Sequence, residues 1–162
     1  MSVQVPDVTI DIQALSVSDD TKNLRKIKHA IANAIIIAIV DCLRDAIRLA
    51  WRIVPESKYG DYPESYESEA LLESFVAFIQ NQIRDLTAGR RILKPEYIIE
   101  QDWEASYAEF VNEMTGVTWS KPSSQSGFIE RIDNFIRQNL KAYLDAELSK
   151  KQHGLSLLYT VR

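Results

Sequence analysis

Cysteine and histidine are scarce in this sequence, which contains one cysteine and two histidines among 162 residues. A single cysteine excludes a disulfide within the chain. Neither His29 nor His153 has a second histidine, or the cysteine, at metal-ligand spacing. Cys42 falls in the apolar stripe of a helical pattern, where we expect a small buried side chain and not a catalytic thiolate. We therefore expect no metal, no cofactor and no thiol chemistry.

Glycine is also rare, and no two glycines lie close together. The loops that cradle phosphate groups, in phosphate-binding and dinucleotide-binding proteins, need clustered glycines. Their absence excludes both motifs and removes the commonest nucleotide-binding classes. The five positions are Gly60, Gly89, Gly116, Gly127 and Gly154.

The sequence has no long apolar run and no excess of basic charge. The most apolar stretch, Ala30–Val40, falls short of the roughly 20 residues that a membrane span requires. The first residues, MSVQVPDVTIDIQ, lack the basic start and apolar run of a signal peptide. With 19 basic and 23 acidic residues, the net charge is −4. That balance argues against nucleic acid as the main partner. The short apolar run argues against a membrane location.

What remains is ordinary globular composition, with 46% apolar and 26% charged residues. This length predicts a single domain over residues 1–162, with 1–7 and 152–162 as arms or edge strands. Alternation of apolar and polar residues predicts a half-buried strand at Val8–Ala14, with Val8, Ile10, Ile12 and Ala14 on its inward face. The same pattern at Leu155–Val161 predicts a strand, or a tail that adds to the sheet edge of another subunit.

Helical spacing predicts a long helix over Lys22–Val54, ended by Pro55, and a second helix over Phe128–Ser149. The middle of the chain is less clear. Glu69–Leu86 fits either a helix or a strand, Tyr97–Ile99 fits a short strand, and Ser106–Val111 fits a strand end or a helical turn. We expect an α+β fold, in which a small antiparallel sheet packs against one long N-terminal helix and one C-terminal helix.

The long helix has an unusually wide apolar surface. A second apolar row runs beside the main stripe, and Ile37 lies within the polar side. Such a helix is either buried between two layers or meets another subunit, and we favour the second interpretation because a short chain has little material for another layer. The predicted subunit-interface residues are Ile36, Ile37, Val40, Ile47, Leu155, Leu157 and Tyr159.

Two polar segments read as surface loops, Glu56–Ser68 and Met114–Gly127. Their aromatic residues are candidate partner contacts, although packing against the body of the loop fits equally well. The predicted contact residues are Tyr59, Tyr62, Tyr66 and Trp119.

An acidic stretch is the best place for acid–base or metal chemistry. Glu109 and Glu113 would share a face of a helix, but no second pair accompanies them. A solvated acidic edge is the favoured interpretation, and a hydrolase or metal enzyme is the less favoured one. Arg90-Arg91 is too small a cluster for a nucleic-acid footprint. The acidic residues are Glu96, Glu100, Asp102, Glu104, Glu109 and Glu113.

The order of these segments resembles the tail-completion, or head–tail joining, proteins of long-tailed bacteriophages. The most specific match is Tyr107-Ala108-Glu109-Phe110-Val111-Asn112-Glu113, and the sequence differs from the family at Ser68-Glu69, where Thr-Gly is common. The resemblance implies that Ser68–Ser74 enters a sheet and that Tyr107–Glu113 closes it. The segments that match in order are Val8–Ala14, Lys22–Val54, Ser68–Ser74, Tyr107–Glu113, Thr115–Gly127 and Phe128–Ser149.

The resemblance implies a non-enzymatic virion protein, assembled in the host cytoplasm. Its copies would form a ring, typically of six subunits, between the neck connector and the tail tube. Neck, connector and tail-tube proteins would be its partners, and DNA would pass through without specific binding. The alternative is a soluble oligomeric module that binds or regulates another protein, with the tyrosine-rich loop as its contact.

Overall fold

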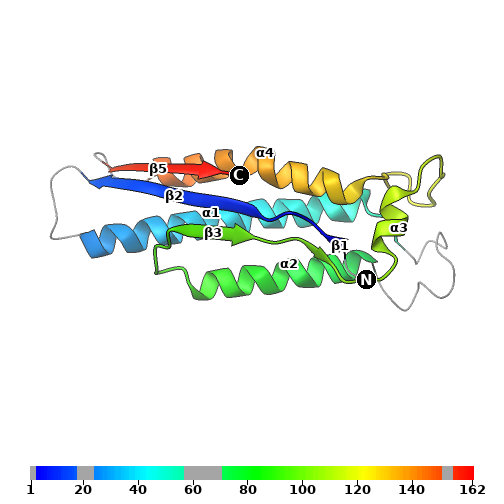
Figure 1. Cartoon of the computed structure of the whole chain (residues 1–162), viewed down its shortest axis with the longest axis horizontal. Coiled ribbons are helices and arrows are strands. Elements are labelled where there is room, and N and C mark those ends of the chain that lie inside the picture. Colours follow the sequence, from blue (N-terminus) through cyan, green and yellow to red (C-terminus); the bar gives the residue numbers. More distant parts are fainter. Residues whose placement is uncertain (1–2, 18–23, 57–70, 151–154) are drawn as a thin grey trace.

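A three-stranded antiparallel sheet lies along three long helices in the computed structural model of the chain (Figure 1). The structure describes residues 3–17, 24–56, 71–150 and 155–162. The α+β fold, with its long N-terminal helix and its C-terminal helix, is confirmed. In chain order the elements are β1 (Val3–Gln4), β2 (Val8–Val17), α1 (Leu24–Ile53), α2 (Leu71–Ala88), β3 (Glu96–Ile99), β4 (Asp102–Trp103), α3 (Ala108–Glu113), α4 (Phe128–Ser149) and β5 (Leu155–Val161).

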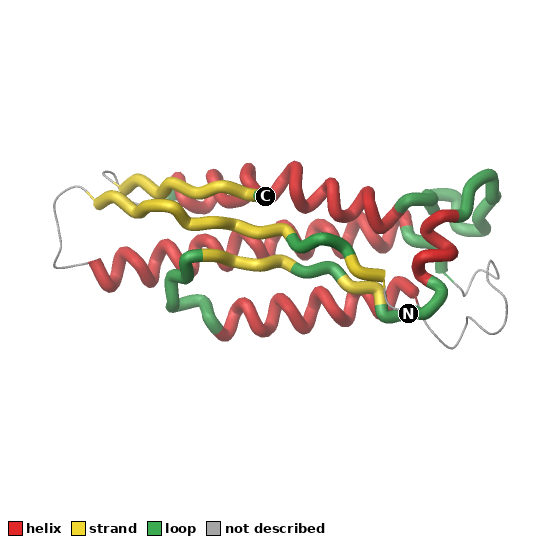
Figure 2. Tube along the Cα trace, in the orientation of Figure 1, coloured by secondary structure: helices red, strands yellow, loops and turns green. Residues whose placement is uncertain are grey.

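The molecule has two layers. Strand β2 is central, with β3 and β5 as edge strands, and all pairings are antiparallel. Helix α1 lies between α2 and α4, and the three helices share one side of the sheet (Figure 2). Strand β1 pairs with β4 in a separate two-stranded ribbon near the N-terminus. The opposite sheet face has no covering element in the described chain, and Ile98 and Leu158 are exposed there.

Helix α1 is the centre of the core, and this corrects the expectation about its second apolar row. Ile36 and Val40 are only 4% and 7% exposed, and Ile47 packs against the same core. The sheet, α2 and α4 surround the helix, so the chain itself covers residues that the sequence predicts to contact another subunit. Among the predicted helix positions, Ile37 stays accessible, at 37% exposure.

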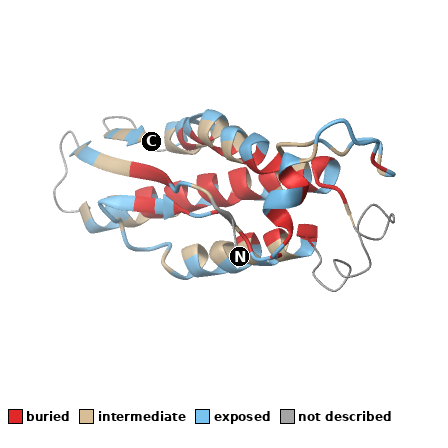
Figure 3. Ribbon diagram, turned by 45° about the vertical axis from the view of Figure 1, so that its right-hand side comes forward, coloured by how far each residue is buried: buried red, intermediate tan, exposed pale blue. Residues whose placement is uncertain are grey.

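The first two turns of α1 project past the fully buried part of this core, and Ile27 packs against its edge. No residue of Leu24–Ala30 is buried, whereas Ile31 and most of the apolar residues after it are. Figure 3 shows the same contrast between the exposed start of α1 and its buried middle. The exposed side chains of this projecting segment, Arg25, Lys26 and Lys28, are available for a role other than packing.

Strand β2 is longer than predicted and contains a β-bulge. Ile12 pairs with Tyr159, but Ala14, not Gln13, pairs with Leu158. The extra residue reverses the alternation. Leu15 therefore packs toward the core while Ala14 is exposed, so the prediction that Ala14 faces inward was wrong.

The middle of the chain is helical where the sequence left a choice. Leu71–Ala88 forms α2, with Leu72, Phe75 and Ile79 buried on one side at helical spacing. Tyr107 precedes α3, so Tyr107–Glu113 is a helical segment that does not close the sheet. The described part of Ser68–Ser74 begins α2 and does not enter a sheet. Both sheet positions implied by the family resemblance are therefore wrong.

An aromatic cluster ties α2, β4 and α4 together at the α3 end of the molecule. The fully buried Trp103 stacks on Phe75, with ring centroids 4.5 Å apart and planes 13° apart. Phe128, the first residue of α4, lies 5.2 Å from the Trp103 ring in a tilted arrangement. These contacts join three elements far apart in the sequence.

Other predictions agree with the structure. Helix α4 has the predicted bounds, and β3 includes Tyr97–Ile99. Strand β5 pairs with β2 of its own chain, so it is a strand of this sheet and not a tail. No helix in the described ranges is long and apolar enough to cross a membrane.

Candidate functional site

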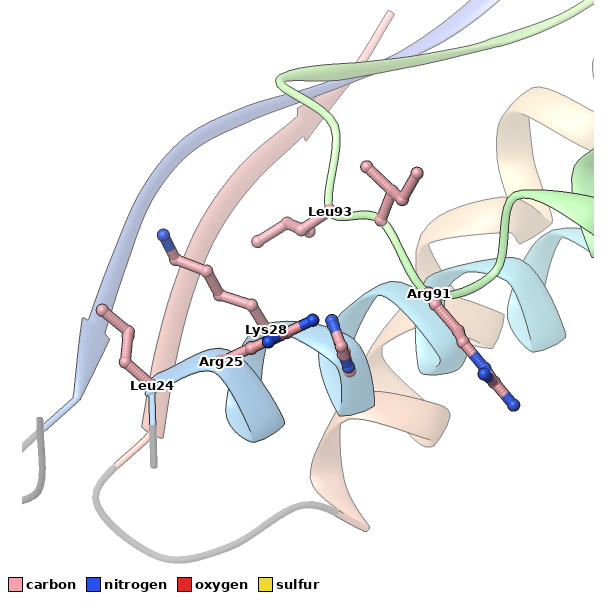
Figure 4. Close-up of a pocket in the computed structure, with 7 residues that line it drawn as sticks. Leu24, Arg25, Lys28, Arg91 and Leu93 are labelled. Carbon is pink, nitrogen blue, oxygen red and sulfur yellow. The ribbon is translucent and has the colours of Figure 1, made fainter. Parts of the chain in front are cut away.

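The fold brings basic side chains from two distant segments to one end of the molecule. Arg25, Lys28 and His29 come from the projecting start of α1, and Arg90 and Arg91 come from the turn after α2. These five residues, here called the basic end cluster, line two adjoining hollows of about 500 Å³ and about 400 Å³ that share His29 and Arg91. Figure 4 shows the larger hollow. Leu24, Ile92 and Leu93 supply an apolar wall to the larger hollow.

The turn that carries Arg90 and Arg91 is held by hydrogen bonds. The amide of Arg90 donates to the carbonyl oxygen of Thr87 at 3.3 Å, and that of Ile92 donates to Gly89 at 3.2 Å. The buried Tyr97 hydroxyl accepts a bond from the Lys94 amide at 3.1 Å and donates to the Ile92 carbonyl at 3.2 Å. Burial raises the pKa of Tyr97 and keeps this hydroxyl protonated. These hydrogen bonds therefore hold the backbone from which the side chains of Arg90 and Arg91 extend.

The electrostatics of the cluster favour an anionic partner. None of the residues that line the two hollows is acidic. Arg25, Lys28, Arg90 and Arg91 are exposed, and in the part of the chain that the structure describes none of them forms an ion pair. Arginine and lysine in this state bind carboxylates or phosphates through charge-assisted hydrogen bonds.

The acidic stretch does not assemble an acid–base or metal site. Its members spread over β3, β4, α3 and the segments between them. Within the described ranges, no group of three His, Cys, Asp or Glu side chains is placed to hold a metal ion. Glu104, Glu109 and Glu113 instead lie exposed on and beside α3, at the opposite end of the molecule from the basic end cluster (Figure 1).

Cys42 is fully buried on the apolar side of α1, as predicted. Burial, with a smaller contribution from the Asp45 charge, raises the pKa of its thiol to about 12. A thiol in this state is not a nucleophile at neutral pH.

The predicted interface residues of the C-terminal strand are mostly turned toward the core. Leu157 and Tyr159 are half-buried, and the Tyr159 hydroxyl donates to the Asp145 carboxylate on α4. The side chain of Leu155 lies outside the described residues. These contacts within the chain argue against Leu157 and Tyr159 as contacts between subunits.

The predicted loop contacts have a mixed outcome. Tyr59, Tyr62 and Tyr66 lie outside the described residues. Trp119 is only 9% exposed, so it anchors its loop and does not reach for a partner. The same loop is held against the end of α1, where Lys121 Nζ donates to the Val54 carbonyl at 2.9 Å and the Gln125 amide donates to Ile53 at 2.8 Å.

The basic end cluster is the feature that sequence reasoning missed. Arg90-Arg91 alone is too small a cluster for a nucleic-acid footprint, and His29 has no partner at metal-ligand spacing in the sequence. A signal did exist, because basic residues concentrate at the start of α1, whose first turn contains no acid. Only the fold places that turn beside Arg90 and Arg91.

Comparison of the chain with protein-family models, with curated proteins and with solved structures finds no match. A functional interpretation therefore depends on the residues of the chain itself.

Proposed function

We propose that this chain is a non-enzymatic structural protein of a phage or phage-like tail. In this proposal its copies form a ring, with six subunits as the expected number, at the neck or top of the tail tube. The ring joins the head connector to the tail, so the protein is part of the virion after assembly in the host cytoplasm. Its partners are further copies of itself and the neck, connector and tail-tube proteins, and DNA passes without specific binding.

The observation that carries this proposal is that a basic cluster and an acidic cluster lie at opposite ends of the molecule. The basic end cluster lies where α1 begins, and Glu104, Glu109 and Glu113 lie at the α3 end. A ring requires a heterologous contact, in which two different patches of neighbouring copies meet. Complementary ends of an elongated subunit supply such a pair of patches.

The charges along the sides of the molecule strengthen this argument. Arg137 pairs with Asp133 at 2.9 Å, Lys141 with Asp145 at 2.7 Å and Lys150 with Glu147 at 2.8 Å. Glu104, Glu109 and Glu113 have no ion pair within the described chain, and the same holds for the four cations of the basic end cluster. Within the residues that the structure describes, three carboxylates at the α3 end and four cations at the other end thus have no ion pair.

The family resemblance supplies the biological setting. The order of a strand, a long helix, a middle segment, a loop and an amphipathic helix agrees with the family, although two of the implied sheet positions are wrong. The alternative is an oligomeric protein-binding module that uses the same ends for another partner.

The first experiment is native mass spectrometry across a concentration series, with negative-stain images of the heaviest species. We expect closed rings that dissociate as salt screens the end charges. A chain that stays monomeric both alone and with connector and tail-tube proteins would contradict the proposal. Recovery of a single cellular partner, with no tail component, would favour the binding module.

Charge reversal tests the contact itself. One variant carries Arg25→Glu with Arg91→Glu, so that both ends are acidic. A second variant carries Glu109→Lys with Glu113→Lys, so that both ends are basic. In each case the ends of neighbouring copies repel. Self-association should weaken about tenfold or more in each variant, because several exposed pairs of about 0.2–1 kcal/mol change sign. Mixing the two variants should restore association, since every acidic end then meets a basic one. Arg44→Glu with Arg84→Glu, on the exposed sides of α1 and α2, is the matched control.

A further inference from the structure

The two ends of the molecule differ in shape as well as in charge. Helix α3 presents Phe110, which is 59% exposed, between Glu109 and Glu113. Glu113 follows Phe110 by one helical turn and so lies on the same face. The α3 end is therefore an apolar side chain accompanied by carboxylates.

The basic end has the complementary arrangement, an apolar hollow accompanied by cations. Its larger hollow of about 500 Å³ has an apolar wall of Leu24, Ile92 and Leu93, and Arg25, Lys28 and Arg91 line the same hollow. Ile92 is 65% exposed, so this wall is accessible from outside. A cavity of about 150 Å³ can hold a benzene ring, so the hollow has room for an aromatic side chain.

We propose that Phe110 of one copy inserts into the hollow between Leu24, Ile92 and Leu93 of a second copy. The carboxylates of Glu109 and Glu113 then meet Arg25, Lys28 and Arg91 around the aromatic ring. This inference rests on the proposed function and names the contact that would join neighbouring subunits. An aromatic anchor in an apolar pocket, with charged groups at its rim, is the arrangement that carries most of the energy of protein interfaces.

Charge favours a second copy over a polyanion as the occupant. The chain has a net charge of −4, so a nucleic acid is repelled by the molecule as a whole. The α3 end of another copy brings a few carboxylates and an apolar side chain, which match both components of the hollow. A phosphate backbone would leave the apolar wall without a partner.

Truncation of the anchor is the first test. Phe110→Ala and Ile92→Asp should each weaken self-association about tenfold or more in sedimentation equilibrium, because both exposed side chains belong to the proposed contact. Val117→Ala, at an exposed loop position, is the control for Phe110→Ala and should associate like the native chain. Circular dichroism checks that every variant keeps its helical content.

Cross-linking tests the geometry directly. A mixture of chains with Phe110→Cys and chains with Ile92→Cys should form a mixed disulfide dimer in high yield after mild oxidation, since the inserted side chain contacts Ile92. Replacing Phe110→Cys by Val117→Cys should abolish that yield. The native Cys42 does not interfere because it is fully buried. A mixed dimer no more abundant than in the Val117→Cys control would overturn the docking.

The outcomes separate this inference from the proposed function. If Phe110→Ala and Ile92→Asp associate like the native chain while the charge-reversal variants lose self-association, the Phe110 anchor is overturned. The ring proposal then still stands. Association that depends on Phe110 but yields open chains supports the anchor and contradicts the ring. Binding to duplex DNA of mixed sequence is measured for the native chain and for Arg25→Glu with Arg91→Glu. If only the native chain binds DNA, and Phe110→Ala associates normally, the hollow belongs to nucleic acid and the anchor is overturned.

Discussion

Asn112 of α3 closes the N-terminal end of α4 through Ile129. Its side-chain oxygen accepts a hydrogen bond from the Ile129 amide at 2.9 Å, and its Nδ2 donates to both carboxylate oxygens of Glu130 at 2.9 and 3.0 Å. Gly127, the residue before α4, has a φ of 69° and makes no side-chain cap. Its amide donates to the Asn112 carbonyl at 2.8 Å. A buried asparagine from another helix thus performs the task of the missing cap.

Replacement of Asn112 should therefore destabilise the fold. We expect Asn112→Ala to lower the free energy of unfolding by about 1–3 kcal/mol, because the buried Ile129 amide loses its acceptor. Urea denaturation followed by circular dichroism measures this change. Gln138→Ala, on the exposed side of α4, is the control and should stay within about 0.5 kcal/mol of the native chain. Equal stability of the two variants would show that the cap contributes little.

Trp103 should be the most sensitive position of the aromatic cluster. Its ring contacts both Phe75 and Phe128 and is fully buried, so Trp103→Ala leaves a cavity between α2 and α4. The expected loss is about 3–5 kcal/mol. Trp103→Phe keeps an aromatic ring and should cost less. Thermal unfolding of the three proteins, compared at matched conditions, checks this order, and an equal loss in both variants would argue against the stacking contribution.

Adjacent residues of α1 should respond differently to the same charge. Ile36 is 4% exposed and Ile37 is 37% exposed. Ile36→Asp places an unpaired carboxylate in the core, so we expect the chain to lose its cooperative unfolding transition. Ile37→Asp should retain the native helical content and near-native stability. Circular dichroism and urea denaturation distinguish the two, and an unfolded Ile37→Asp would place that side chain inside the core.

Asp145 links the stability of the C-terminal strand to pH. Hydrogen bonds from Lys141 and, secondarily, Tyr159 lower the pKa of Asp145 below its ordinary value. A lowered folded-state pKa gives stability that is present above the ordinary carboxyl pKa and is lost as pH falls through the folded value. The difference in unfolding free energy between the native chain and Asp145→Asn should therefore be full at neutral pH and disappear in acid.

The control for this pH dependence is Lys141→Met. It removes the 2.7 Å bond to the Asp145 carboxylate and should shift the acid loss toward the ordinary carboxyl range. Urea titrations from neutral to acidic pH measure both variants. An unchanged midpoint in Lys141→Met would mean that this exposed pair contributes nothing measurable.

Long amphipathic segments were the most predictable part of the fold. Helix α4 repeats its apolar residues over six turns, which leaves little freedom in its bounds, and α1 is similar. Helix α2 was ambiguous because the run Phe75–Ile79 suits a strand as well as a helix. Packing against Trp103, which lies far along the chain, decides in favour of the helix. Local sequence contains no information about such a contact.

The candidate site was less predictable than the fold. Each half of the basic end cluster is small, and neither half has a motif. Their joint meaning depends on the turn after α2 reaching the projecting start of α1. In the same way, one inserted residue in β2 reversed the orientation of Ala14 and Leu15, since alternation is counted without knowledge of bulges.

The bulge at Gln13 also restricts how β5 can be assembled onto the sheet. A regular strand can slip by two residues and still present the same face to the core. Here Ile12 pairs with Tyr159 and Leu15 pairs with Leu157, while Gln13 between them has no partner in β5. A slipped β5 would place regularly paired backbone opposite this bulge and lose hydrogen bonds. The bulge therefore fixes the register of β5: it selects one position for the C-terminal strand among several that composition alone would permit.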